Sequence, residues 1–149
     1  MARTPTGALD GPVRRLSGAA DKSRLWLAIA VTSATVNLGV KPIARRGRPD
    51  RAQPALFEGR HVPMPRSASF PSGHSASAFA FAYAVGRHLP VLAVPIRLLA
   101  VAVAYSRVHT GVHYPGDVVI GSVTGAGTAA MVAAVADRAT RARASGRAG

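Results

Sequence analysis

The sequence has no cysteine, few acidic residues and few aromatic ones. The absence of cysteine excludes disulfides, thiol catalysis and every cysteine-ligated zinc site. Only 6 residues are Asp or Glu against 19 Lys and Arg, which gives a net charge of +13, and aromatic residues make up 5% of the 149 positions. Charged residues reach only 17% in total, whereas 48% of the chain is hydrophobic. This balance excludes a disordered basic chain and favours a small membrane protein or a protein that binds anions.

The basic residues gather at both ends of the chain and in one internal stretch. Both ends are also rich in Ala, Gly, Ser and Thr, so we expect residues 1–20 and 139–149 to be mobile basic tails that flank one domain at 21–138. The internal stretch, 41–66, holds seven basic residues and only two acidic ones. Its prolines prevent one continuous helix, which predicts a long functional loop over 41–71.

Four apolar segments predict helices at 25–40, 75–86, 91–105 and 118–136. We therefore expect an all-α, membrane-embedded bundle of about four helices. The first segment is short for a membrane span, and a buried core helix and a signal peptide are alternatives for it. In the last segment small residues recur at every fourth position, which predicts a smooth face for close helix packing and, as a hypothesis, for a homodimer. These residues are Gly121, Gly125, Ala129 and Ala133.

The charge pattern also predicts how the helices cross the bilayer. If the basic N-terminus is inside, the loops 41–71 and 106–116 lie together on the outer face, and the basic C-terminus returns inside. The loop 41–71 then carries its arginines on the side where the positive-inside tendency disfavours them. An anionic ligand would explain this departure. We therefore expect a multi-pass protein of the cell membrane whose site faces the extracytoplasmic side.

The two outer loops contain the residue types that a catalytic anion site requires. Arg offers a planar fork for phosphate oxygens, Lys a point charge, and the start of a helix unpaired N–H groups. Two histidines and a carboxylate add a nucleophile or base, an acid and an orienting partner. This set predicts phosphoryl transfer without a metal ion. Its members are Lys41, Arg45, Arg46, Arg48, Ser72, Gly73, His74, Ser106, Arg107, His109, His113 and Asp117.

Three short motifs in these loops resemble those of the type 2 phosphatidic acid phosphatases (PAP2), which share their site with the vanadium haloperoxidases. Lys-x6-Arg-Pro occurs at 41–49, Pro-Ser-Gly-His at 71–74, and Ser-Arg-x5-His-x3-Asp at 106–117. Each motif alone is weak evidence, whereas all three in this order are strong. The resemblance covers 41–117 and implies a metal-independent phosphatase with a reduced version of the family's helical fold.

The resemblance also implies a role for each matching residue. His113 would attack phosphorus and form a phosphohistidine, with Asp117 holding its other ring nitrogen. His74 would protonate the departing alkoxide and later activate water. The remaining matches would hold the phosphate oxygens: Lys41, Arg48, Ser72, the Gly73 amide and Arg107. The implied substrate is a lipid phosphate or diphosphate, such as phosphatidate or a polyprenyl phosphate or diphosphate, and no cofactor is implied.

Three other interpretations stay open at this stage. His109, His113 and Asp117 are spaced i, i+4, i+8, which on one helix would form a metal-binding face. Pro115 and Gly116 argue against that face, because they favour a helix that begins near Asp117. A vanadate-dependent haloperoxidase would share the same residues. Arginine-rich ends also occur in basic membrane-associated or nucleic-acid-associated proteins, but no aromatics are interleaved with the basic clusters, so we expect no nucleic acid partner.

The remaining polar and aromatic residues of the loops receive structural interpretations. Arg45 and Arg46 could contact substrate, but we favour their interpretation as interfacial anchors or spare charge. For Tyr114 we expect a packing role, and for His61 and His88 a solvated side chain.

Overall fold

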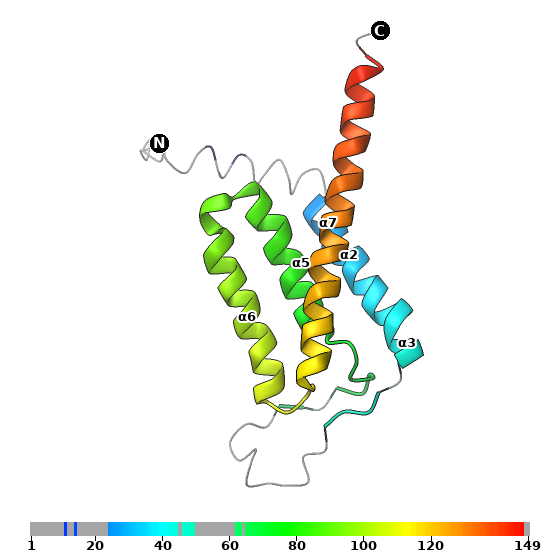
Figure 1. Cartoon of the computed structure of the whole chain (residues 1–149), viewed down its shortest axis with the longest axis vertical. Helices are drawn as coiled ribbons and strands as arrows, with labels where there is room; N and C mark the ends of the chain where they lie inside the picture. The colour runs from blue at the N-terminus through cyan, green and yellow to red at the C-terminus, as the bar shows by residue number, and fades with distance from the viewer. Residues whose placement is uncertain are drawn as a thin grey trace, which may run out of the picture.

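The computed structural model describes residues 11, 14, 24–44, 46–49, 62–63 and 65–147 (Figure 1). These residues form helices and loops, and no strand occurs among them. The expected all-α bundle is therefore confirmed. Most of the predicted N-terminal tail, together with Arg45 and His61, lies outside the described residues.

The first apolar segment forms one continuous helical rod with three parts. It begins as the α-helix α2 (Arg24–Ala34), continues as the π-helical η1 (Thr35–Val40) and ends as α3 (Lys41–Ala44). The prediction ended this helix at residue 40, whereas the structure continues it to Ala44. As a result, Lys41 lies on the last part of a helix and not in the predicted loop over 41–71.

The other three predicted helices are also present. They are α5 (Gly73–His88), α6 (Ala93–His109), which follows the short 3₁₀ turn η2 (Pro90–Leu92), and α7 (Pro115–Ser145). The last helix is longer than predicted and continues to Ser145, through much of the segment that we expected to be a mobile tail. This segment is rich in Ala and Arg, which are strong helix formers, and that composition explains the extension.

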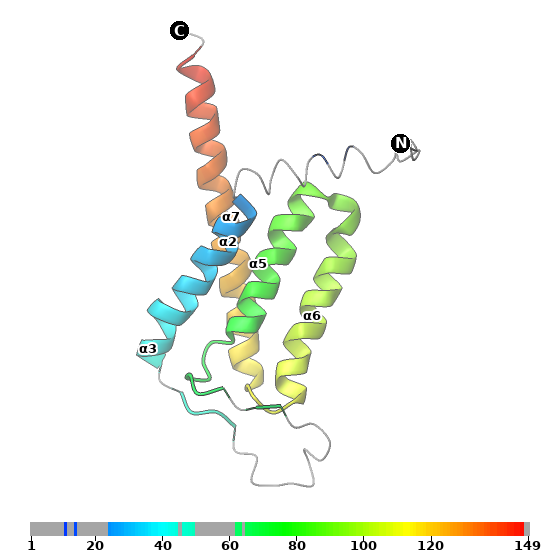
Figure 2. The ribbon, with the colours of Figure 1, turned by 180° about the vertical axis from the view of Figure 1, so that it is seen from behind.

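Helix α5 is the central element of the bundle. It packs against α2, α6 and α7; α6 runs antiparallel beside it, and α2 and α7 lie on its other side (Figures 1 and 2). The interior is built from small side chains. One cluster joins Ala28 of α2, Ala80 of α5 and Ala129 of α7, all of them buried. Small residues let helices approach closely where apolar burial from water does not drive packing, as in a bilayer.

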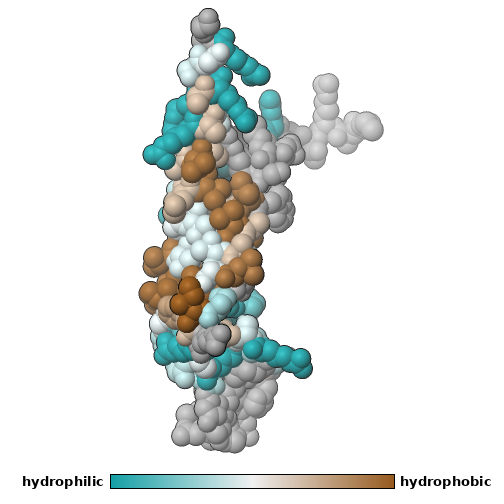
Figure 3. Space-filling view, turned by 90° about the vertical axis from the view of Figure 1, so that its right-hand side faces the viewer, coloured by the Kyte–Doolittle hydropathy of each residue, from teal (hydrophilic) through white to brown (hydrophobic). Residues whose placement is uncertain are grey.

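The outer surface carries the larger apolar side chains. Leu98 and Leu99 on α6 are 64% and 62% exposed, and Met131 on α7 is 71% exposed. In Figure 3 the apolar side chains gather around the middle of the molecule and the hydrophilic ones at its two ends. Three stretches are long and apolar enough to cross a membrane: Leu27–Ala44, Pro90–His109 and Pro115–Ser145. An apolar exterior around a small-residue interior is the arrangement of a multi-pass membrane protein.

The smooth face predicted on the last helix packs against α5. A Cβ added to Gly121 would lie 2.4 Å from the carbonyl oxygen of Ser72, and one added to Gly125 would lie 2.0 Å from that of Ala76. The two backbones therefore approach too closely for any residue except glycine at these positions. This contact also brings the start of α5 next to α7. Because α5 already covers this face, a homodimer formed through it would have to displace α5, and the dimer itself stays a prediction.

The close contact between α5 and α7 predicts opposite effects for two glycine substitutions on α7. Gly125→Ala should lower the melting temperature by several degrees, because the clash is with backbone and overpacking of this kind costs about 1–3 kcal/mol. Gly127→Ala is the matched control, since a Cβ there meets no atom within 4 Å and alanine is the better helix former. Thermal unfolding in detergent checks this, and equal destabilisation by both variants would contradict the contact.

Candidate active site

Two loops meet at one end of the bundle (Figure 1). One joins α3 to α5 and the other joins α6 to α7. The Arg48 guanidinium of the first donates to the carbonyl oxygen of Val112 in the second, at 2.7 Å from Nη1. The backbone N–H of Ser72 donates to the carbonyl oxygen of Asp117 at 2.8 Å. The prediction that these loops share one face is therefore confirmed for their described residues.

A glycine turn sets the position of His113. Helix α6 ends at His109, and Gly111 has a φ of 65°, a left-handed conformation that glycine adopts without strain. The turn directs the chain back over α6, where the N–H groups of Val112 and His113 both donate to the carbonyl oxygen of Arg107 at 3.2 Å. His113 is left only 4% exposed. Arg107 thus supports the backbone of His113 from the preceding helix.

Asp117 has a structural role at the start of α7 as well as a position facing His113. Pro115 opens the helix, where its missing N–H costs nothing, and Asp117 is the third residue. The Oδ2 atom of Asp117 accepts the backbone N–H of Tyr114 at 2.9 Å, and a carboxylate is favoured at the positive end of a helix. The same oxygen lies 3.5 Å from Nδ1 of His113. Asp117 is fully buried, so its carboxylate is shielded from bulk water.

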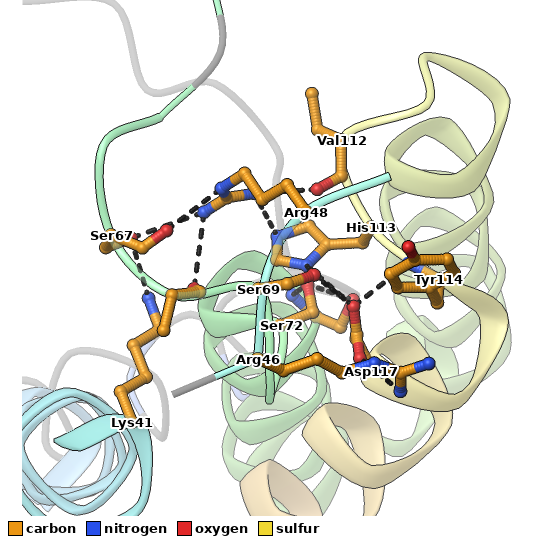
Figure 4. Close-up of polar contacts among 12 residues, drawn as sticks. Lys41, Arg46, Arg48, Ser67, Ser69, Ser72, Val112, His113, Tyr114 and Asp117 are labelled. Atoms are coloured by element: carbon orange, nitrogen blue, oxygen red, sulfur yellow. Dashed lines mark hydrogen bonds and ion pairs between the residues drawn. The ribbon is translucent and has the colours of Figure 1, made fainter. Parts of the chain in front are cut away.

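Arg46 and Ser69 complete the surroundings of the Asp117 carboxylate (Figure 4). Arg46 Nη1 donates to Oδ1 at 3.2 Å, and its guanidinium lies 4.2 Å from the centre of the Tyr114 ring. The Ser69 hydroxyl donates to Oδ2, and its Oγ lies 3.5 Å from Nδ1 of His113. The interpretation of Arg46 as an anchor or spare charge is corrected by these contacts. Ser69 lies only two residues before the Pro-Ser-Gly-His motif, and no pattern in the sequence marks it.

Two of the predicted phosphate-binding cations, Arg48 and Lys41, meet near His113. Arg48 Nη1 lies 3.4 Å from His113 Nε2, and Arg48 Nε donates to the carbonyl oxygen of Ser67 at 3.0 Å. The hydroxyl oxygen of Ser67 lies 3.3 Å from Arg48 Nη2 and 3.3 Å from the Lys41 ammonium. Lys41 from the end of the helical rod and Arg48 from the loop therefore meet at one oxygen atom. Ser67 is a second residue that the sequence analysis missed.

The start of α5 supplies three more of the predicted residues, Ser72, Gly73 and His74. Ser72 is the N-cap: its hydroxyl oxygen accepts the Ser75 hydroxyl at 3.0 Å and the Ser75 backbone N–H at 3.4 Å. Gly73 and His74 open the helix, where backbone N–H groups have no partner within the helix. Partial burial, followed by three nearby cations of which Arg107 is the strongest, lowers the pKa of His74. Lys41 and Arg48 thus act on both histidines, and Arg107 acts on His74.

The electrostatic surroundings favour a neutral His113. Burial, and next the positive charge of Arg48, lower the pKa of this imidazole, while the Asp117 carboxylate opposes them. Nδ1 faces the carboxylate and is expected to carry the proton. Nε2 faces the Arg48 guanidinium, which can only donate, so its lone pair points toward the cations. A neutral ring with its lone pair beside fixed positive charge can attack an anionic phosphorus centre.

The alternative of a metal-binding helix face is wrong. His109 is the last residue of α6, with its Nδ1 atom 3.4 Å from the Tyr105 hydroxyl, whereas His113 lies in the loop and Asp117 on α7. The three side chains therefore do not share one helix. Within the described part of the chain, no group of three His, Asp or Glu residues is arranged to hold a metal ion.

Comparisons with known proteins show what this chain is similar to. A sequence model of the PAP2 superfamily matches residues 22–141. Decaprenylphosphoryl-5-phosphoribose phosphatase of Mycobacterium tuberculosis is 37% identical over 144 residues, which cover 92% of this chain and 71% of that protein. Phosphatidylglycerophosphatase B of Bacillus subtilis is 36% identical over 108 residues, 65% of this chain and 49% of that protein. The crystal structure of a transmembrane PAP2 type phosphatidylglycerolphosphate phosphatase from Bacillus subtilis superposes with a TM-score of 0.64 and 27% identity, over 91% of this chain and 71% of that one.

The arrangement around His113 predicts how its imidazole titrates. In the wild type its pKa should lie below 6.5, the ordinary value. Arg48→Gln should raise it, because removal of a neighbouring positive charge stabilises the protonated ring. NMR of labelled histidine checks this, with the His113 signal assigned by its loss in His113→Asn. Arg66→Gln changes an exposed arginine and serves as the control. A wild-type pKa at or above 6.5, or no rise in Arg48→Gln, would contradict the geometry.

Proposed function

Because the chain belongs to the PAP2 superfamily, we propose that it is a metal-independent phosphatase that hydrolyses a lipid phosphate or diphosphate through a phosphohistidine on His113. The family and the named relatives make it a hydrolase of phosphate esters in a membrane. The observation that carries the proposed mechanism is the orientation of the His113 ring. Nδ1 lies toward the Asp117 carboxylate, and Nε2 lies 3.4 Å from Arg48, on the side where a phosphate would be held.

In the first step Nε2 of His113 forms a bond to phosphorus while the bond from phosphorus to the ester oxygen breaks. His74 gives its proton to the departing oxygen, so that an alcohol leaves instead of an alkoxide. The imidazolium formed on His113 is stabilised by the buried Asp117 carboxylate. A phosphate dianion bound among the cations would offset their effect on His74 and favour its protonated form.

In the second step water replaces the histidine on phosphorus. His74, now without its proton, takes a proton from water, whose oxygen bonds to phosphorus as the bond to Nε2 breaks. The products are inorganic phosphate and a regenerated neutral His113. Lys41, Arg48 and Arg107 counter the charge on the phosphate oxygens in both steps, together with Ser72 and the Gly73 amide. One well-placed donor of this kind is worth about 3–4 kcal/mol of transition-state stabilisation.

Three observations support a lipid-linked substrate that is approached from the outer face. The site lies at one end of a bundle with an apolar surface. The names of the relatives given above also describe phosphatases of lipid-linked phosphates. At the opposite end, basic residues gather on α5 and on the C-terminal part of α7, which suits the cytoplasmic side: Arg87, Arg138, Arg141 and Arg143.

This orientation predicts which positions can be labelled from outside the cell. In intact cells an impermeant reagent should label a cysteine placed at Arg66, and it should not label one placed at Arg141. The reverse result would contradict this orientation.

The proposed function predicts phosphate release that does not need a metal ion. Purified protein should hydrolyse phosphatidate, polyprenyl phosphates or polyprenyl diphosphates in the presence of excess EDTA, because fixed cations replace the metal. His113→Ala should abolish turnover of every substrate, since no phosphoenzyme can form. The matched control is His88→Ala, which changes a histidine at the other end of α5 from the site. Loss of activity with EDTA and recovery with zinc or magnesium would contradict the mechanism.

A further inference from the structure

The direct contact between the proposed nucleophile and its carboxylate partner is long. Nδ1 of His113 lies 3.5 Å from Oδ2 of Asp117, beyond the usual 2.7–3.2 Å range of N–H···O hydrogen bonds. The Ser69 hydroxyl donates to that same Oδ2 atom and lies equally far from Nδ1, at 3.5 Å. Three polar atoms thus form a compact triangle behind the ring, on the side away from Arg48 (Figure 4).

We propose that Ser69 is a positioning residue that orients the Asp117 carboxylate and keeps the proton of His113 on Nδ1. This inference rests on the proposed function, since it concerns how the nucleophile is prepared. A hydroxyl that donates its hydrogen to Asp117 turns its lone pairs toward other donors. The N–H at Nδ1 then faces two acceptors, the Ser69 oxygen and the carboxylate. The tautomer with the proton on Nε2, which would block attack on phosphorus, is disfavoured by both.

The burial of Ser69 supports this role. Both Ser69 and Asp117 are 0% exposed, so bulk water does not compete for their hydrogen bonds. The other two contacts of the carboxylate are made by Arg46 at Oδ1 and by the Tyr114 N–H at Oδ2. Neither reaches His113 by a described contact. Among the described residues, Ser69 is the one whose side chain lies beside both members of the pair, donating to Oδ2 of Asp117 and lying 3.5 Å from Nδ1 of His113.

A purely structural role for Ser69 makes a different prediction. The backbone N–H of Ser69 donates to the carbonyl oxygen of Arg46 at 2.9 Å, which ties the two ends of the long loop together. This backbone bond is retained in Ser69→Ala, which removes only the hydroxyl. If the backbone bond is the whole contribution of Ser69, the alanine variant should keep its activity and the tautomer of His113.

The kinetic test compares Ser69→Ala with a matched serine substitution. Ser69→Ala should lower kcat by about 10–100-fold, the usual loss when a group that orients a functional side chain is removed, with little change in KM. In an Asp117→Asn background it should add little further loss, because the hydroxyl acts through that carboxylate. Ser122→Ala is the control, since its hydroxyl bonds only to the Val118 carbonyl of its own helix in the described structure, at 2.8 Å. Unchanged kcat in Ser69→Ala would overturn the proposal.

The spectroscopic test does not depend on turnover. In protein labelled with ¹⁵N-histidine, His113 of the wild type should be predominantly the Nδ1–H tautomer, and Ser69→Ala should increase the Nε2–H fraction. An unchanged tautomer in Ser69→Ala would overturn the positioning role even if activity falls. If the wild type hydrolyses none of the phosphates tested, the proposed function fails, whereas the tautomer measurement still decides the role of Ser69.

Discussion

The buried carboxylate of Asp117 is the constraint on which the rest of the site depends. A carboxylate that is taken out of water without partners costs several kcal/mol, so a fold that buries one must supply them. The partners come from segments far apart in the sequence: Arg46 and Ser69 from the long loop and the Tyr114 N–H from the start of α7. The backbone carbonyl of the same residue anchors Ser72 at the start of α5. Satisfying one buried charge thus assembles both loops, and the site is a consequence of that assembly.

The helical bundle has the complementary task of holding this assembly at a membrane surface. Small residues form its interior and larger apolar ones its exterior, which suits lipid on the outside and leaves polar groups for the two ends. Glycines on α7 bring its backbone against α5, so Ser72 and Asp117 lie on neighbouring helix starts. At the far end Arg87 of α5 and Asp137 of α7 form an ion pair that joins the same two helices. The pair α5 and α7 is therefore fixed at both ends, with the site at one of them.

The sequence predicted the parts of this structure that depend on local patterns. Four apolar runs located the helices, and three motifs located the cations and histidines. The recurrence of Gly and Ala located the closely packed face of α7, but it did not identify α5 as the partner of that face. The sequence could not predict contacts made by an irregular loop, because a loop without periodicity does not indicate which of its residues turn inward. Ser69 and Ser67 belong to that class, and Arg46 was taken for one of several equivalent arginines. The continuation of α7 to Ser145 was missed for another reason. The positive charge of residues 139–149 suggested a mobile tail, whereas their Ala and Arg content favours a helix.

Identification of the phosphorylated atom is the most direct test of the proposed chemistry. His74→Ala should accumulate the intermediate from an aryl phosphate, because a phenolate leaves without an acid while water attack lacks its base. After quenching in base, proteolysis and mass spectrometry with NMR of the peptide should find the phosphoryl group on Nε2 of His113, the ring nitrogen that lies 3.4 Å from Arg48. A phosphoryl group on Nδ1 or on another residue would contradict the account. So would a result in which the wild type hydrolyses the substrate but no phosphohistidine can be trapped in His74→Ala.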